Sequence, residues 1–113
     1  MSFEDKYISV EQALSFVKSG DIIVTGLGAA EAGAFMSQLH TIADRVKDVT
    51  VTNCLPMHPS KIYEAQYADS FNVDGWFYAA QLRGAHAQGN MSYIPNHLHF
   101  AGTKRLYHAK PNI

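Results

Sequence analysis

A glycine pair that follows a short apolar run is the feature of the sequence best suited to chemistry. Residues 21–25 are Asp-Ile-Ile-Val-Thr, residues 26–30 are Gly-Leu-Gly-Ala-Ala, and Glu31 follows. The apolar run predicts a buried strand, and the small residues predict a tight turn into a helix that Glu31 opens. Free backbone N–H groups at such a junction point out of the carboxyl edge of a parallel sheet, where open α/β proteins bind ligands. The turn therefore predicts a backbone amide cradle for a carbonyl or carboxylate oxygen.

Two other interpretations of this turn stay open. A dinucleotide fingerprint needs a third glycine where Glu31 stands, and a carboxylate is unfavourable beside a pyrophosphate, so the sequence disfavours a dinucleotide site. The phosphate-binding pattern G-x-x-x-x-G-K-[ST] is absent from the sequence. A strand-to-helix turn with only a packing role is the remaining alternative.

Cys54 and His58 are the residues from which a nucleophilic thiol would be built, but no third, orienting group accompanies them. A lone cysteine at the end of a strand is more often a small buried hydrophobic residue, and we expect that role for Cys54. A single cysteine also excludes an internal disulfide and is typical of a reducing compartment.

The cationic side chains offer two further hypotheses. His97 and His99 could place two imidazoles on one face of an extended segment, but a zinc site needs a third ligand, and no spacing in the sequence selects His86 or His108 for that role. We expect solvated histidines and no metal site. Arg83 follows the third predicted strand, where it could bind an anion; the alternative is a structural ion pair or a surface group.

The elements that must position these residues alternate between helix and strand. A capping box at Ser9 and Gln12 predicts a short helix that Gly20 closes. The later pattern predicts strands at 21–25, 48–53 and 71–79, helices at 30–47, from Ser60 onward and at 82–88, a loop at 55–59 and an extended piece at 91–94. Residues 98–108 have no clear pattern, and Gly102 is expected to break them.

Strand–helix alternation predicts an α/β fold, an open, mostly parallel sheet with flanking helices and right-handed crossovers. The loops near 26–30, 54–58 and 79–83 then share one edge of the sheet. The consecutive aromatic residues Trp76, Phe77 and Tyr78 are expected in the third strand, in the core on both faces.

The overall composition supports one folded unit. A chain of 113 residues is about one domain, and 47% hydrophobic residues suffice for a core. A net charge of −1 argues against nucleic acid or an anionic membrane as the main partner. An N-terminus with acidic residues and no apolar core predicts a cytoplasmic protein without a signal peptide. Residues 110–113 resemble a turn and the start of another strand, so we expect a piece of a longer chain.

Several segments, in this order and spacing, resemble the N-terminal part of the acetyl-CoA hydrolase/transferase family, which includes acetate, butyrate and 4-hydroxybutyrate CoA-transferases. They are residues 18–21, the turn 26–31, Leu55-Pro56, the stretch from Arg83 to Gly89, residues 93–95 and Leu98. Two positions depart from the family pattern. Ala32 stands where the family often has proline, and Leu27 stands where some 4-hydroxybutyrate enzymes have histidine, which favours a plainer acyl group.

This resemblance implies a two-domain enzyme of which residues 1–113 are an incomplete N-terminal α/β domain. Its reaction is ping-pong transfer of coenzyme A from an acyl-CoA to a carboxylate through a glutamyl-CoA thioester. The reactive glutamate and most of the CoA site belong to the C-terminal half of such proteins. Neither Glu31 nor Glu64 stands in the matching motif, so we expect no catalytic residue in this chain. No permanently bound cofactor is implied, and a coenzyme A thioester is the substrate.

The expected contribution of the chain is one wall of the acyl or carboxylate pocket. The residues expected there are Gly26, Leu27, Gly28, Ala29, Ala30, Glu31, Leu55, Pro56, Arg83 and Pro95. The expected partners are the remaining polypeptide or a companion chain, the two substrates, and a second copy in a dimer that covers the apolar sheet edge. The alternatives are an acyl-CoA hydrolase of the same family, a non-catalytic α/β binding or assembly module, and an NAD- or flavin-type oxidoreductase fragment that Glu31 disfavours.

Overall fold

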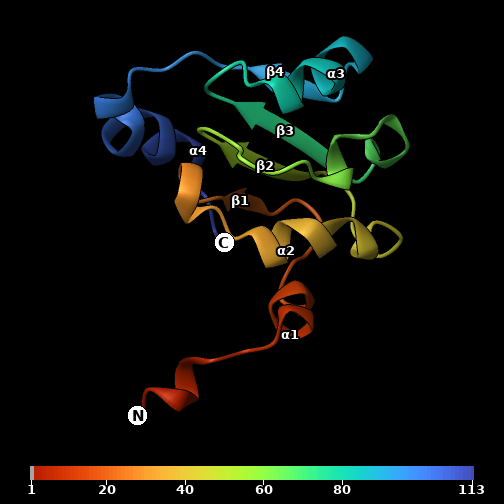
Figure 1. The fold of residues 1–113 in the computed structure, drawn as a ribbon, viewed down its shortest axis with the longest axis vertical. Coiled ribbons are helices and arrows are strands. Elements are labelled where there is room, and N and C mark those ends of the chain that lie inside the picture. The colour runs from red at the N-terminus through yellow and green to blue at the C-terminus, as the bar shows by residue number, and fades with distance from the viewer. Residues whose placement is uncertain (1) are drawn as a thin grey trace.

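The computed structural model describes residues 2–113 and is built on a four-stranded parallel sheet (Figure 1). The strands are β1 (Ile22–Val24), β2 (Val49–Asn53), β3 (Phe71–Gly75) and β4 (Met91–Tyr93), in the spatial order β1-β2-β3-β4. Val51 of β2 lies opposite Ile23 of β1 and Val73 of β3. The α/β class and the parallel sheet predicted from the sequence are confirmed.

Strand order that follows chain order, with crossovers of one hand, places all connecting segments on one face of the sheet. The connections hold α2 (Gly33–Gln38), the 3₁₀ turns η2 (Gly28–Ala30), η3 (Leu39–Ile42), η4 (Lys61–Tyr63) and η5 (Ala65–Tyr67), and α3 (Ala80–Gln88). Outside these crossovers, η1 (Glu4–Lys6) and α1 (Val10–Ser15) precede the sheet. The predicted capping box forms, since Ser9 Oγ accepts from Gln12 N and Gln12 Oε1 accepts from Ser9 N.

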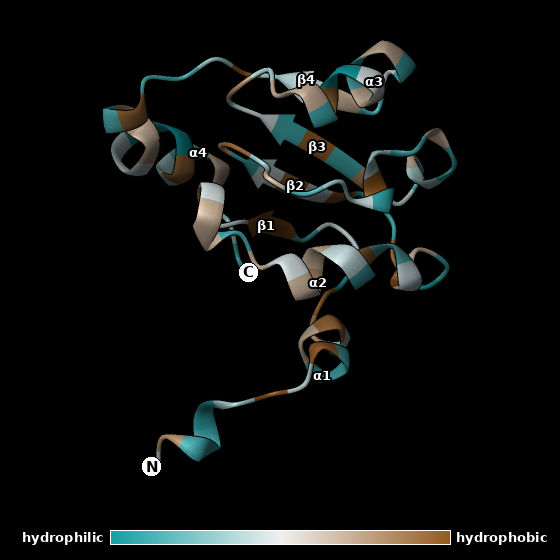
Figure 2. Ribbon diagram, in the orientation of Figure 1, coloured by the Kyte–Doolittle hydropathy of each residue, from teal (hydrophilic) through white to brown (hydrophobic). Residues whose placement is uncertain are grey.

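The hydrophobic core lies between this helical layer and alternate residues of the strands. It contains Ile23, Val49, Val51, Phe71, Val73 and Met91 from the sheet, Leu14 and Val17 from the segment before β1, and Met36, Leu39, Val46, Ile62, Tyr63, Leu82 and Ala85 from the connecting segments. Figure 2 shows the same pattern as hydrophobic colouring along β1 and alternating colours along β3. Because side chains alternate along a strand, the intervening residues belong to the other face.

The other face is contacted by the C-terminal helical segment. This segment comprises η6 (Leu98–Phe100), the π-helical η7 (Ala101–Leu106) and α4 (Tyr107–Ala109). Arg105 Nη2 lies 2.7 Å from Asp74 Oδ2 of β3, and this ion pair holds the segment to the sheet. The expectation that Gly102 breaks residues 98–108 was wrong, because the exposed glycine is accommodated inside a π-turn of a continuous helical run.

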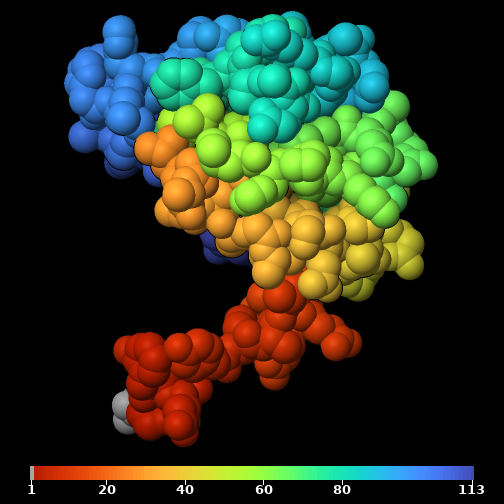
Figure 3. All heavy atoms as spheres, viewed as in Figure 1, coloured from red at the N-terminus to blue at the C-terminus, as the bar shows by residue number. Residues whose placement is uncertain are grey.

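Residues 112 and 113 pair with the free edge of β1. Asn112 N donates to Ile22 O at 3.0 Å, and Val24 N donates to Ile113 O at 3.0 Å. The predicted start of another strand is thus hydrogen-bonded to the edge of β1, but no strand is assigned to residues 110–113. The N-terminal residues, by contrast, project from the body of the molecule (Figure 3), and Phe3, Tyr7 and Phe16 are all exposed.

The predicted long helix over 30–47 was wrong in extent. It is divided into α2 and η3 and ends at Ile42. The predicted helix from Ser60 was wrong: the segment forms only two 3₁₀ turns. The Ser60 hydroxyl makes no capping hydrogen bond and instead donates to the Met36 carbonyl at 2.8 Å, which ties the segment to α2.

The expected third strand also ends early, at Gly75. Trp76 is buried and its Nε1 donates to Thr52 Oγ1, but Phe77 and Tyr78 are exposed in the loop that follows, so they do not form a two-sided core. The predicted helix over 82–88 is confirmed as α3, which Gly89 ends with φ +87°.

Asp21 joins the start of β1 to the C-terminal residues. One carboxylate oxygen accepts from Lys18 N at 2.7 Å, and the other accepts from Asn112 Nδ2 at 2.7 Å. The hydrogen bond from Lys18, followed by the one from Asn112, lowers the pKa of Asp21 from its ordinary value of 3.8.

A lowered pKa gives Asp21 a defined effect on stability against pH. Its stabilising contribution is complete above the ordinary pKa and is lost as the pH falls through the lowered folded-state pKa. We therefore expect Asp21→Asn to cost about 1 kcal/mol of unfolding free energy at pH 7 and progressively less below pH ~4. Urea unfolding from pH 7 to pH 2.5 measures this difference, with the exposed Asp44→Asn as control. A difference that does not change with pH would contradict the assignment.

Candidate functional site

The glycine turn after β1 has the tight geometry that the sequence predicts. Gly28 has φ +56°, a left-handed backbone conformation that residues other than glycine rarely adopt. A Cβ on Gly26 would collide with the carbonyl group of Ala30, so the chain folds back on itself at this position. Both glycines are therefore required by the backbone path of the turn.

The turn is joined to the loop that follows β2. Gly28 N donates to Leu55 O at 3.2 Å, and Glu31 Oε2 accepts from Met57 N at 2.9 Å and from His58 N at 3.2 Å. The prediction that Glu31 lies in the first turn of a helix was wrong, because α2 begins only at Gly33. Its carboxylate bridges two loops instead.

The loop after β3 lies beside the same group. Trp76 N donates to Asn53 O at 3.0 Å, and Phe77 N donates to Cys54 O at 3.2 Å. Gln81 Nε2 reaches Met57 O at 3.4 Å. The structure thus brings together the three loops that the sequence places at the carboxyl edge.

The residues predicted for the pocket wall fall into two groups. Residues 26–31 contact Leu55 and its neighbours, with Leu27, Ala29 and Ala30 exposed, Leu55 half-buried and Pro56 buried. The remaining two, Arg83 and Pro95, lie farther along the edge.

Arg83 and Pro95 do not join the glycine turn. The Arg83 side chain is exposed and its Cζ lies 5.9 Å from the centroid of the Tyr78 ring, whose hydroxyl is 2.9 Å from His86 Nδ1. Pro95 follows β4, which is three strand spacings, or about 14 Å, from β1. It lines a separate pocket of about 310 Å³ with Asn96, His97 and Phe100.

The amide cradle is smaller than the sequence suggests. The N–H groups of Gly28, Ala30 and Glu31 donate to the carbonyls of Leu55, Leu27 and Gly28. Among residues 2–113, no hydrogen bond engages the N–H groups of Gly26, Leu27 and Ala29. The amides of Gly26 and Leu27, which precede the 3₁₀ turn, and that of Ala29 are the donors available to an oxygen of a ligand.

Gly26 also lines an apolar groove of about 400 Å³ beside β1. The groove is bounded by Ile8, Ala13, Phe16, Ile23, Val24, Thr25, Ala32, Phe35 and Ile113. It lies between the N-terminal segment and the edge strand, so the turn is next to a cavity rather than sealed inside the fold.

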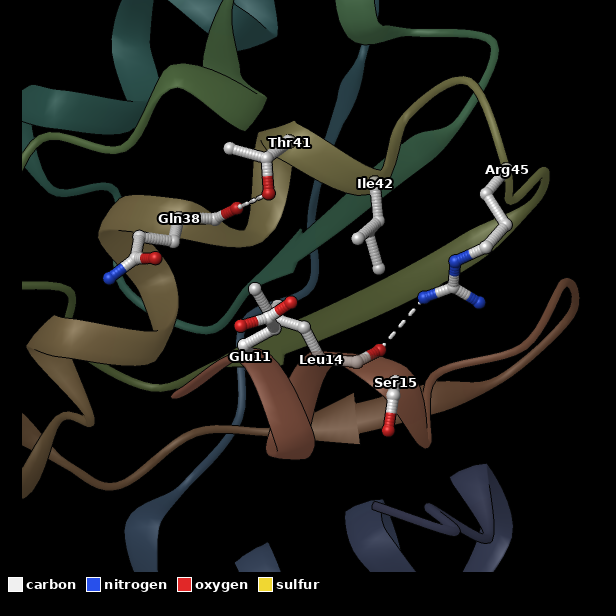
Figure 4. A pocket seen from close by; sticks show the side chains of 7 residues that line it. All are labelled: Glu11, Leu14, Ser15, Gln38, Thr41, Ile42 and Arg45. Atoms are coloured by element: carbon white, nitrogen blue, oxygen red, sulfur yellow. Dashed lines mark hydrogen bonds between the residues drawn. The ribbon is translucent and has the colours of Figure 1, made fainter. Parts of the chain in front are cut away.

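The pocket shown in Figure 4 has a different character. It has a volume of about 440 Å³ and lies between α1 and the α2–η3 segment, lined by Glu11, Leu14, Ser15, Gln38, Thr41, Ile42 and Arg45. The Arg45 guanidinium donates to Leu14 O and Val17 O, both at 2.8 Å. Arg45 therefore satisfies carbonyls at the C-terminal end of α1, a structural role.

Several polar side chains near the carboxyl edge are buried without hydrogen-bond partners in the described residues. They are Thr25 Oγ1, both amide atoms of Asn53, Glu31 Oε1 and the Tyr63 hydroxyl. Burial, together with the charge of Glu31, raises the pKa of Tyr63. Of these residues, only Glu31 was predicted for the site from the sequence; the signal for the others was Asn53, a polar residue that ends an otherwise β-branched strand.

Cys54 is buried, and desolvation raises the pKa of its thiol, which makes it a poor nucleophile. Its expected role as a small buried hydrophobic residue is confirmed. The rings of His97 and His99 are 5.6 Å apart, but residues 2–113 contain no group of three potential metal-binding side chains. Within the same residues, no helix has both the length and the hydrophobicity needed to cross a membrane.

Solved structures share this fold. RipA from Yersinia pestis is 24% identical, with a TM-score of 0.74 over 92% of this chain and 26% of the RipA chain. Two RipA variants give TM-scores of 0.75 and 0.78 at 24% and 23% identity. The chain thus has the α/β fold of about a quarter of RipA. No protein-family model matches the sequence, and neither does any curated protein.

Two glycine-to-alanine variants test the geometry of the turn, and a third, in α3, is the control. We expect Gly26→Ala to cost about 1–3 kcal/mol of unfolding free energy through its collision with Ala30, and Gly28→Ala about 1–2 kcal/mol through left-handed strain. Gly84→Ala, an exposed position of α3 with open space for a Cβ, should instead stabilise by up to about 1 kcal/mol. Urea unfolding measures all three. Equal effects at the three positions would show that the turn is not constrained.

Proposed function

We propose that residues 1–113 form the N-terminal segment of an acyl-CoA:carboxylate CoA-transferase and line its acyl or carboxylate pocket. The proposal rests on the glycine turn, which lies against the Leu55 loop at the carboxyl edge, within segments that resemble the acetyl-CoA hydrolase/transferase family. The likeness in fold to a quarter of the longer RipA chain supports a segment of a larger protein.

The proposed chemistry assigns bond making and breaking to polypeptide outside these residues. A glutamate there attacks the thioester carbonyl and expels the CoA thiolate, which leaves a mixed anhydride. The thiolate then attacks the glutamyl carbonyl, releases the first carboxylate and forms the glutamyl-CoA thioester. A second carboxylate reverses these steps and leaves as its CoA thioester.

The contribution of this segment is to stabilise charge and to exclude water. Each attack places negative charge on a carbonyl oxygen, and fixed backbone donors stabilise such an oxyanion. The free N–H groups of Gly26 and Leu27 are suited to this role. The small side chains of Ala29 and Ala30 allow an acyl group to approach the main chain closely.

The apolar surface beside β1 indicates that a partner covers this part of the molecule. The groove beside β1 and the exposed Ile8 and Phe16 form an apolar surface at the edge strand. We propose that the remaining polypeptide or a companion chain covers it, in a dimeric enzyme located in the cytoplasm.

A CoA-exchange assay tests the proposed reaction. The full polypeptide that contains these residues is incubated with acetyl-CoA and a panel of small carboxylates, and borohydride is added to trap the enzyme thioester. We expect exchange with at least one carboxylate and a reduced, trapped enzyme. Release of free CoA without exchange would favour a hydrolase, and no reaction of either kind would favour a non-catalytic binding module.

A bulky residue in the turn tests the location of the pocket. We expect Ala29→Leu to lower kcat/KM for acyl-CoA at least about tenfold, which corresponds to about 1.4 kcal/mol of transition-state binding. Ala87→Leu on the exposed side of α3 is the matched control. Equal kcat/KM values in the two variants would place the acyl pocket elsewhere.

A further inference from the structure

We propose that Glu31 is a positioning residue that holds the glycine turn and the loop after β2 as one rigid unit. It acts as a hydrogen-bond acceptor and not as a nucleophile or a proton carrier. The activity part of this inference rests on the proposed function, but the structural part does not.

Three hydrogen bonds join the two loops. One carboxylate oxygen, Oε2, accepts from the backbone N–H groups of both Met57 and His58 at 2.9 and 3.2 Å. The Gly28–Leu55 hydrogen bond at 3.2 Å forms a third link. Hydrogen bonds to a charged acceptor are about twice as strong as neutral ones, so Glu31 is the main tie between the loops.

The main chain of Glu31 is itself fixed within the turn. Glu31 N donates to Gly28 O at 3.0 Å, and Gly33 N donates to Glu31 O at 2.8 Å. The residue that reaches across to the second loop is thus also fixed in the main chain of the turn. Without the bonds of its side chain, the turn that carries the free N–H groups of Gly26 and Leu27 would be joined to the second loop only by the Gly28–Leu55 hydrogen bond.

The other carboxylate oxygen of Glu31 is not accessible to a substrate. Glu31 Oε1 is buried and has no hydrogen-bond partner in the described residues, and the buried Tyr63 hydroxyl is also unpartnered. An oxygen enclosed by protein cannot reach a thioester carbonyl, and Oε2 is engaged by two backbone donors. Neither oxygen is placed to attack a substrate.

Substitutions of Glu31 distinguish a positioning residue that joins the two loops, here called the latch, from a catalytic carboxylate. Glutamine keeps one carbonyl oxygen that can accept from both N–H groups, whereas aspartate is one methylene shorter and alanine has no acceptor. We expect Glu31→Ala and Glu31→Asp to speed hydrogen exchange of the Met57 and His58 amides about tenfold or more, and Glu31→Gln to restore most of the protection. Glu11→Ala, which removes an exposed carboxylate on α1, is the control.

The activity readout uses the same variants in the full polypeptide that contains these residues. We expect kcat of CoA exchange to fall in Glu31→Ala and Glu31→Asp and to recover substantially in Glu31→Gln, with an unchanged pH profile. Loss of turnover in Glu31→Gln despite protected amides would overturn the inference, because it would make the carboxylate itself essential. Protected Met57 and His58 amides in Glu31→Ala would overturn it as well.

The two proposals fail separately. If the wild-type protein exchanges no CoA but the amides respond as expected, the proposed function fails and the latch stands. If exchange activity is present and Glu31→Ala leaves both the amides and kcat unchanged, the latch fails and the proposed function stands.

Discussion

The structure depends on a parallel sheet whose strands follow chain order, so that all crossovers pack on one face. Each crossover returns over the same face, so all connecting helices and 3₁₀ turns pack on alternate residues such as Val49, Val51 and Val73. All strands point the same way, so all of their following loops emerge at one edge. The core and the candidate site are therefore consequences of the same topology.

Because the crossovers cover only one face, the opposite face of the sheet must be covered by another segment. Thr52, Asp74 and Trp76 alternate with the core residues and would otherwise face solvent. The C-terminal helical segment meets them through the Arg105–Asp74 ion pair and then brings Asn112 and Ile113 to the edge of β1. Asp21 completes this arrangement, because its carboxylate binds both the turn before β1 and Asn112.

At the carboxyl edge, the candidate site is made of backbone more than of side chains. Gly26 and Gly28 permit the path of the turn, and Glu31 fixes that path to the second loop. A site of this kind suits reactions that develop charge on a carbonyl oxygen, because backbone donors held in place need no reorganisation when the charge appears. This is the physical link between the fold and the proposed transferase.

The sequence by itself determined the strands, the capping box at Ser9, the helix ended by Gly89 and the turn at Gly26–Gly28, because these follow from local preferences and the spacing of apolar residues. Local preference was not enough for residues 30–47 or 60–67, where packing against the sheet replaced long helices with short turns.

The role of Glu31 was likewise set by tertiary structure, because its partners lie 26 and 27 residues away in the chain. The separation of Pro95 from the turn depended on strand order, which no local pattern encodes. Periodicity and turn chemistry act within a few residues, whereas the juxtaposition of loops depends on which strands become neighbours. The sequence alone therefore determined where the strands and the tightest turns lie, whereas the tertiary structure decided the lengths of several helices and which elements meet.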